Sequence, residues 1–120
     1  MFRVIIAGSR DFGNYSLLCK TMDRLLCNKR GENIQIVCGK ARGADTLGER
    51  YARERGYSVN DFPANWKTYG KRAGYMRNVE MAQNADALVA FWDGQSRGTA
   101  HMIKTVGEYG LLVRVIKYLR

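Results

Sequence analysis

A short stretch near the middle of the chain, Val37 to Thr46, constrains the fold more than any other part of the sequence. It reads V-C-G-K-A-R-G-A-D-T and joins an apolar run, Ile34 to Cys38, to a helical pattern from about Ala44 to Arg55. A glycine-bearing turn from a strand into a helix presents free backbone N–H groups and the positive end of the helix dipole, which favours phosphate. Taken alone, the turn fits a tight strand-to-helix connection without a ligand equally well.

Other short apolar runs alternate with helical patterns on both sides of this stretch. They span Phe2–Ala7, Tyr57–Phe62, Asp86–Trp92 and Leu111–Ile116. The run before Pro63 is more polar than the others, which predicts a place near a sheet edge. Strands that alternate with helices form parallel sheets with right-handed crossovers. We therefore expect one α/β domain over residues 1–120, with a five-stranded, mainly parallel sheet flanked by helices.

Three glycine-bearing turns, at 8–13, 39–43 and 94–98, follow predicted strands. The carboxyl ends of parallel strands share one edge of the sheet, where ligands of such folds bind. The meeting of three such turns predicts a crevice for a phosphate-bearing ligand. The candidate ligand-binding residues are Gly8, Ser9, Arg10, Gly39, Lys40, Arg42, Gly43, Ala44, Asp45, Trp66, Arg77, Asp93, Gly94, Ser96, Gly98 and Thr99.

The basic and hydroxyl side chains among these candidates each allow two interpretations. Arg10, Arg42 and Arg77 have the chemistry to clamp phosphates with two hydrogen bonds, or they are solvated surface residues. Ser96 and Thr99 either donate hydroxyl groups to a phosphate or cap the last helix. The two roles of the hydroxyls are compatible.

The carboxylates and the single histidine are less specific signals. Asp45 either holds a ribose hydroxyl or complements the dipole of its helix. Arg77, Glu80 and Asp93 are the candidate catalytic residues, although no spacing in the sequence demands a general base. His101 is expected on a solvent-exposed helix face rather than in catalysis.

The stretch from Ala64 to Tyr75 has no clear periodicity, so we expect a long loop of the kind that often binds ligands, followed by a short helix over Met76–Asn84. Trp66, Tyr69 and Trp92 are available to stack on a base, each contributing about 1–3 kcal/mol. The alternative is that Trp92 lies partly in the core and Trp66 covers a hydrophobic edge.

The net charge of +9 and the isoelectric point near 9.8 favour a polyanionic partner, either a phosphorylated small molecule or nucleic acid. The 20 Lys and Arg residues are spread along the chain, which argues against a dedicated DNA-binding arm. The three cysteines form no C-x-x-C pair, which disfavours disulfides and a zinc site. We therefore expect buried thiols, a cytoplasmic location, and no metal or cofactor. No apolar run approaches the ~18 residues of a membrane span.

Four segments together resemble the SLOG superfamily, named for DNA-processing protein A and the Lonely Guy proteins, and most of all its YspA-like branch. They are V-I-I-A-G-S-R-D-F (4–12), V-C-G-K-A-R-G-A-D (37–45), R-N-V-E-M-A-Q-N-A-D-A-L (77–88) and W-D-G-Q-S-R-G-T (92–99). The resemblance implies a Rossmann-like fold, a pocket for a nucleotide-derived ligand and a homo-oligomer.

The Lonely Guy proteins are phosphoribohydrolases with motifs similar to R-K-x-x-M and P-G-G-x-G-T-x-x-E. Arg77, Gly98 and Thr99 match these motifs, but Met102 stands where the family has its essential glutamate. The resemblance therefore favours a protein that binds an ADP-ribose-like or cyclic nucleotide as a sensor or sequestering protein. Two alternatives stay open: hydrolysis of an N-glycosidic or phosphoester bond in such a ligand, and single-stranded DNA binding.

Overall fold

The computed structural model describes residues 1–29 and 33–119, and within them five strands form one sheet. The strands are β1 (Phe2–Gly8), β2 (Ile34–Cys38), β3 (Ser58–Asp61), β4 (Ala87–Trp92) and β5 (Leu112–Lys117). Their order is β3-β2-β1-β4-β5, and all four neighbouring pairs are parallel. The predicted five-stranded parallel sheet is confirmed, and β3 lies at an edge as its polar sequence indicates.

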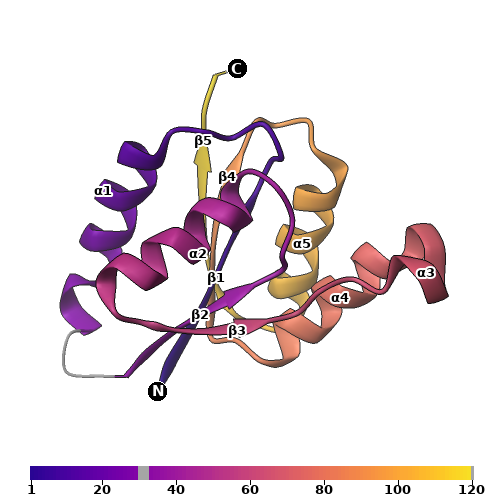
Figure 1. The fold of residues 1–120 in the computed structure, drawn as a ribbon, viewed down its shortest axis with the longest axis horizontal. Helices are drawn as coiled ribbons and strands as arrows, with labels where there is room; N and C mark the ends of the chain where they lie inside the picture. Colours follow the sequence, from indigo (N-terminus) through magenta and orange to yellow (C-terminus); the bar gives the residue numbers. More distant parts are fainter. Residues whose placement is uncertain (30–32, 120) are drawn as a thin grey trace.

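Helices cover both faces of the sheet (Figure 1). They are α1 (Tyr15–Leu26), α2 (Ala44–Arg55), α3 (Trp66–Tyr69), α4 (Ala73–Gln83) and α5 (Arg97–Glu108), with 3₁₀ turns η1 (Cys27–Lys29) and η2 (Gly70–Arg72). In Figure 1, α1 and α2 lie on one side of the sheet, and α4 and α5 lie on the other. None of the helices in the described part of the chain has the length and apolarity needed to cross a membrane.

Each layer of helices encloses its own part of the core. The side chains of Val4, Ile6, Leu18, Tyr51 and Phe91 are buried between the sheet and the α1–α2 layer. On the other face, the buried side chains include Ile5, Val37, Met81, Met102 and Val106. Both layers draw on β1, because successive residues of a strand point to opposite faces and every inward position of this central strand is apolar.

The strand order reverses between β1 and β4, and this reversal positions the site. From β1 the chain proceeds through α1 on one face, whereas from β4 it proceeds through α5 on the other face. The two connections therefore diverge above the sheet and leave a crevice at the carboxyl ends of the strands. The turns after β1, β2 and β4 all lie at that end (Figure 1).

Local signals set the ends of two helices. The Asn14 side chain caps α1 by accepting a hydrogen bond of 3.0 Å from the amide of Leu17. The helix predicted from Ala44 to Arg55 is α2, and Gly56 closes it in the left-handed conformation, with φ +75°.

The long loop predicted over residues 64–75 is wrong, because most of this segment is helical. Asn65 caps α3 by accepting a hydrogen bond of 3.2 Å from Thr68, and α4 begins at Ala73 rather than at Met76. None of the residues of α3 or η2 is buried. The sequence therefore lacks the apolar periodicity from which these helical turns would have been recognised.

Two other expectations about burial are also wrong. Helical periodicity predicts Tyr109 in the core, but α5 ends at Glu108 and Tyr109 is 47% exposed. The sequence predicts that all three cysteines are buried. Cys38 is buried, but Cys19 is half-buried and Cys27, at the C-terminus of α1, is exposed.

Candidate functional site

A pocket of about 230 Å³ lies at the carboxyl ends of the strands, where the three glycine-bearing turns meet. The turns contribute Gly8, Arg10, Ala41, Asp45, Gly98 and Thr99 to its lining. Segments α3 to α4 contribute Trp66, Lys71, Tyr75, Arg77 and Asn78. The pocket thus brings together eight of the residues proposed from the sequence, Ser96 included.

The remaining candidates lie beside this pocket or beneath it. Gly39, Lys40 and Arg42 line a neighbouring hollow of about 230 Å³. Ser9 and Asp93 line another, of about 480 Å³. The other three, Gly43, Ala44 and Gly94, belong to the turns themselves: Gly43 and Gly94 have φ of +76° and +84°, and Ala44 is fully buried.

Two glycines allow the turns to approach each other closely. A Cβ atom on Gly43 would lie 2.3 Å from the carbonyl oxygen of Ser9, and its positive φ disfavours other residues. A Cβ atom on Gly8 would lie 2.2 Å from the carbonyl oxygen of Phe91. These positions hold the turn after β1 against the turn after β2 and against β4, so the convergence of the turns depends on them.

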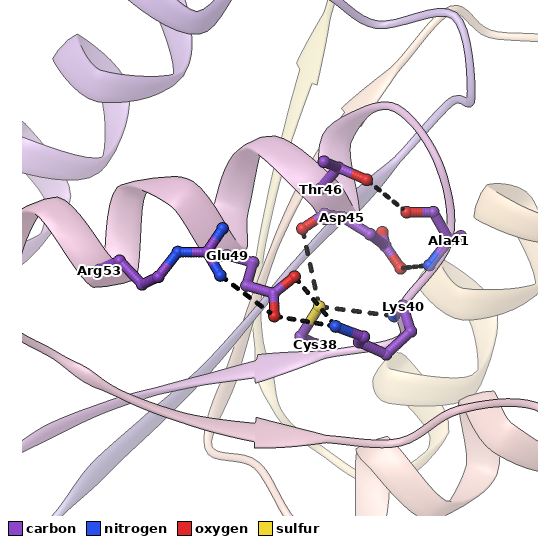
Figure 2. A network of polar contacts seen from close by, with 7 residues as sticks. All are labelled: Cys38, Lys40, Ala41, Asp45, Thr46, Glu49 and Arg53. Atoms are coloured by element: carbon purple, nitrogen blue, oxygen red, sulfur yellow. Dashed lines mark hydrogen bonds and ion pairs between the residues drawn. The ribbon is translucent and has the colours of Figure 1, made fainter.

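Side chains hold the turn after β2 against the first turn of α2 (Figure 2). The Asp45 carboxylate accepts a hydrogen bond of 3.3 Å from the amide of Ala41, and the Thr46 hydroxyl donates one of 2.9 Å to the Ala41 carbonyl. The Lys40 ammonium pairs with Glu49 at 2.9 Å. The amide of Lys40 also points to the buried Cys38 sulfur, at 3.4 Å. These contacts join the turn to the first two helical turns of α2 and to the end of β2.

Asp45 is the one acid among the described residues that line the pocket. Its side chain is buried, with 5% exposed. Burial raises the pKa of Asp45 to about 6, although the hydrogen bond from Ala41 and the charge of Arg77 oppose this shift. A carboxyl group with this pKa is half protonated near pH 6, so both of its forms are populated close to neutral pH.

Arg77 connects α4 to the turn after β2. Its guanidinium donates to the carbonyl of Gly39 and, through Nε, to the side-chain oxygen of Asn78 at 3.3 Å. The Asn78 amide in turn donates to the carbonyl of Gly98 at 3.3 Å. Burial lowers the pKa of Arg77 while the Asp45 carboxylate opposes the change. Arg77 and Asn78 together link the turn after β2 to the start of α5.

The start of α5 is ordered by its own cap. The Ser96 hydroxyl accepts from the amide and the hydroxyl of Thr99, at 3.4 and 3.2 Å. The Asp93 carboxylate accepts from the amides of Gln95 and Ser96, both at 2.8 Å. The capping role of Ser96 is therefore observed, and the Asp93 carboxylate orders the loop. Glu80 is exposed and is not among the described residues that line the pocket.

The sequence predicts His101 on a solvent-exposed helix face, and this prediction is wrong. It is half-buried, its Nδ1 lies 3.1 Å from the amide nitrogen of Asn78, and its ring lies 4.4 Å from that of Tyr75. Burial lowers the pKa of His101. The helical period locates the face that packs on the sheet, but it does not show that α4 covers a second side of α5.

Sequence reasoning missed Lys71, Tyr75 and Asn78 among the lining residues. Asn78 is 5% exposed in the structure, and its one signal in the sequence is its place directly after Arg77. Lys71 and Tyr75 lie in the segment 64–75 that we expected to bind ligands, but no pattern within it singles them out. Within the described residues, no three His, Cys, Asp or Glu side chains are grouped so as to hold a metal ion.

Comparison with known proteins adds two similarities in sequence. Residues 2–69 match the model of the YspA, cpYpsA-related SLOG family. The chain is also 36% identical to the gene 61 protein of Mycobacterium phage D29, over 94% of each protein.

Two solved structures share the fold. A structural genomics target, TM1055, superposes with a TM-score of 0.68 at 23% identity, over 94% of this chain and 72% of that one. DNA processing protein A from Streptococcus pneumoniae superposes with a TM-score of 0.72 at 17% identity, over 95% of this chain and 49% of that one. These likenesses establish the parallel α/β architecture.

Proposed function

This chain belongs to the YspA, cpYpsA-related SLOG family, and from that premise we propose that it binds a nucleotide or a nucleotide-derived small molecule. The ligand we propose is ADP-ribose-like or a cyclic nucleotide, and the protein acts as its sensor or sequestering agent. The observation that carries this proposal is the meeting of Arg10, Arg77 and the first turns of α2 and α5 around one pocket.

The phosphate-binding part of the proposal rests on charge and helix direction. Asp45 in the first turn of α2, and Gly98 and Thr99 in the first turn of α5, line the pocket, so two positive helix ends border it. Arg10 and Arg77 add two guanidinium charges beside these helix ends, and two nitrogens of Arg77 already donate to Gly39 and Asn78. A single phosphate group held here would satisfy both kinds of donor.

The base-binding part rests on exposed aromatic rings at the rim. Trp66 and Tyr75 line the pocket, yet 50% and 46% of their surfaces are exposed. Large rings left in contact with water beside a pocket gain from covering by a flat ligand. A nucleobase that stacks on one of them would gain about 1–3 kcal/mol.

Isothermal titration calorimetry with AMP, ADP-ribose and cyclic AMP tests the proposal. We expect saturable heat with at least one of them. The absence of heat with all three, at protein concentrations in the high micromolar range, would overturn it. A single-stranded oligonucleotide belongs in the same panel, because tight binding of DNA alone, weakening steeply with salt, would identify the protein as a DNA binder instead.

One observation favours a second candidate function, hydrolysis of the N-glycosidic bond of such a ligand. Asp45 lines the pocket with a pKa of about 6, whereas Glu80 does not reach it. A protonated Asp45 has the chemistry to give its proton to the departing base as the bond between base and ribose breaks, while water adds to the ribose carbon and its surplus proton returns to the Asp45 carboxylate. Chromatography after incubation separates the two functions. Release of the free base by the unchanged protein but not by Asp45→Asn supports hydrolysis. An unchanged ligand supports binding alone.

A further inference from the structure

Two hollows adjoin the main pocket, and their charges are opposite in character. The first, here named the cationic chamber, is lined by Arg10, Gly39, Lys40, Arg42, Pro63 and Arg77, among others, and has a volume of about 230 Å³. The second, of about 480 Å³, contains Asp11 and Asp93. Arg10 lines the main pocket and both hollows, and the three neighbouring spaces together are here named the groove.

The cationic chamber shares a wall with the main pocket. Arg10, Ala41, Trp66 and Arg77 line both spaces. The main pocket and the chamber are therefore neighbours bordered by the same four residues, and a group attached to a ligand in the main pocket lies next to the chamber. None of the described residues that line the chamber is acidic.

The positive charges in the chamber are not equally available. Lys40 is paired with Glu49 at 2.9 Å, and Arg77 is engaged with the Gly39 carbonyl. Arg10 and Arg42, by contrast, form no ion pair or side-chain hydrogen bond to any residue in the ranges 1–29 and 33–119. Two guanidinium groups thus face an open hollow without a protein anion between them.

We propose that the cationic chamber is a second anion subsite, with Arg10 and Arg42 holding a second phosphate group of the ligand. The ligand class is then a nucleoside 5′-diphosphate or one of its esters, rather than a nucleoside monophosphate. This inference rests on the proposed nucleotide-binding function and specifies its ligand. The nucleoside and its first phosphate occupy the main pocket, and the second phosphate enters the chamber past Arg10.

The hollow that holds Asp11 and Asp93 is a less favourable place for the second phosphate group than the cationic chamber. Among its described lining residues this hollow has one basic side chain, Arg10, whereas the chamber has Arg10, Lys40, Arg42 and Arg77. Arg42 lines the chamber and not the acidic hollow, and it is exposed at the start of α2. Its replacement therefore removes a charge from one side of the groove alone.

Calorimetry with matched pairs of ligands tests the subsite. The panel holds the 5′-mono- and 5′-diphosphates of adenosine, guanosine, cytidine and uridine, and it is measured on the unchanged protein, Arg42→Gln and Arg24→Gln. Arg24 is an exposed arginine in the last turn of α1, so Arg24→Gln makes the same charge change away from the groove.

For the nucleoside that binds, we expect the diphosphate to bind about tenfold more tightly than the monophosphate. Arg42→Gln should abolish this preference, weakening the diphosphate about tenfold and leaving the monophosphate unchanged, whereas Arg24→Gln should preserve it. Equal affinity of mono- and diphosphate for the unchanged protein, or an equal effect of Arg42→Gln on both, would overturn the second subsite and leave nucleotide binding intact. Failure of every ligand to bind would overturn the proposed function itself.

Discussion

The guanidinium of Arg77 donates a hydrogen bond to the backbone carbonyl of Gly39, and this bond joins α4 to the turn after β2. The two residues are 38 positions apart in the chain. The same arginine borders both the main pocket and the cationic chamber. One side chain therefore supports the shape of the turn and supplies charge to the proposed ligand site, and its replacement should affect stability and binding together.

Arg77→Ala should lower the free energy of unfolding by about 1–3 kcal/mol, because the carbonyl of Gly39 loses its partner in a partly buried place. Nucleotide affinity should fall about tenfold or more. Urea unfolding followed by circular dichroism measures the first effect, and calorimetry measures the second. Arg72→Ala, at an exposed arginine of η2, is the control. An unfolding midpoint equal to that of the unchanged protein would contradict the structural role of Arg77.

Gly43→Ala and Gly98→Ala should have opposite effects on stability. At Gly43 the φ is +76°, and an added Cβ atom would lie 2.3 Å from the carbonyl oxygen of Ser9. We therefore expect Gly43→Ala to lower the free energy of unfolding by at least about 1–3 kcal/mol. Gly98 lies in α5 with no atom within 4 Å of an added Cβ, so its replacement should stabilise the helix by roughly 0.5–1 kcal/mol. Thermal unfolding of the two variants provides the comparison. Similar melting temperatures would show that the close approach of the turns is not needed.

Trp66→Ala should weaken nucleotide binding by about 1–3 kcal/mol without lowering stability, since the ring is half exposed and lines the pocket. Tyr69→Ala is the matched control, because Tyr69 is 41% exposed on the same short helix and is not among the lining residues. Quenching of tryptophan fluorescence on titration gives the affinity in the Tyr69 variant, and calorimetry gives it in both. Equal affinities of the two variants would remove Trp66 from the site.

The pH dependence of stability should carry the signature of Asp45. Its folded pKa of about 6 lies above the ordinary value of 3.8, so the folded protein keeps a proton that the unfolded chain releases. The free energy of unfolding should therefore fall as the pH rises from about 4 to about 6, by up to about 3 kcal/mol from this group.

Asp45→Asn removes that contribution while it retains the shape of the side chain. The stability of the variant relative to the unchanged protein should increase as the pH rises from about 4 to about 6, and the difference should stay constant above that interval. Urea unfolding at closely spaced pH values measures the difference. A difference that does not change with pH would show that Asp45 is ionised in the fold as readily as in the unfolded chain.

Much of the fold was predictable because its signals are local. The apolar runs marked the five strands, and the span from Ala44 to Arg55 was correct at both ends, since a glycine lies on either side of it. The edge position of β3 followed from its polar composition. The segment from Trp66 to Arg72 was misjudged because its helical turns bury nothing, so no apolar period marks them.

The sequence by itself determined that three glycine-bearing turns would share one edge, because parallel strands bring their carboxyl ends together wherever they lie in the sheet. Only the tertiary structure decided which side chains complete the pocket. The packing of α4 on α5 brings Asn78 to Gly98 and to His101, and the closure of the turn after β2 buries Asp45. These relationships join residues of different elements. They depend on how the layers pack, which the local periodicity of a single chain does not record.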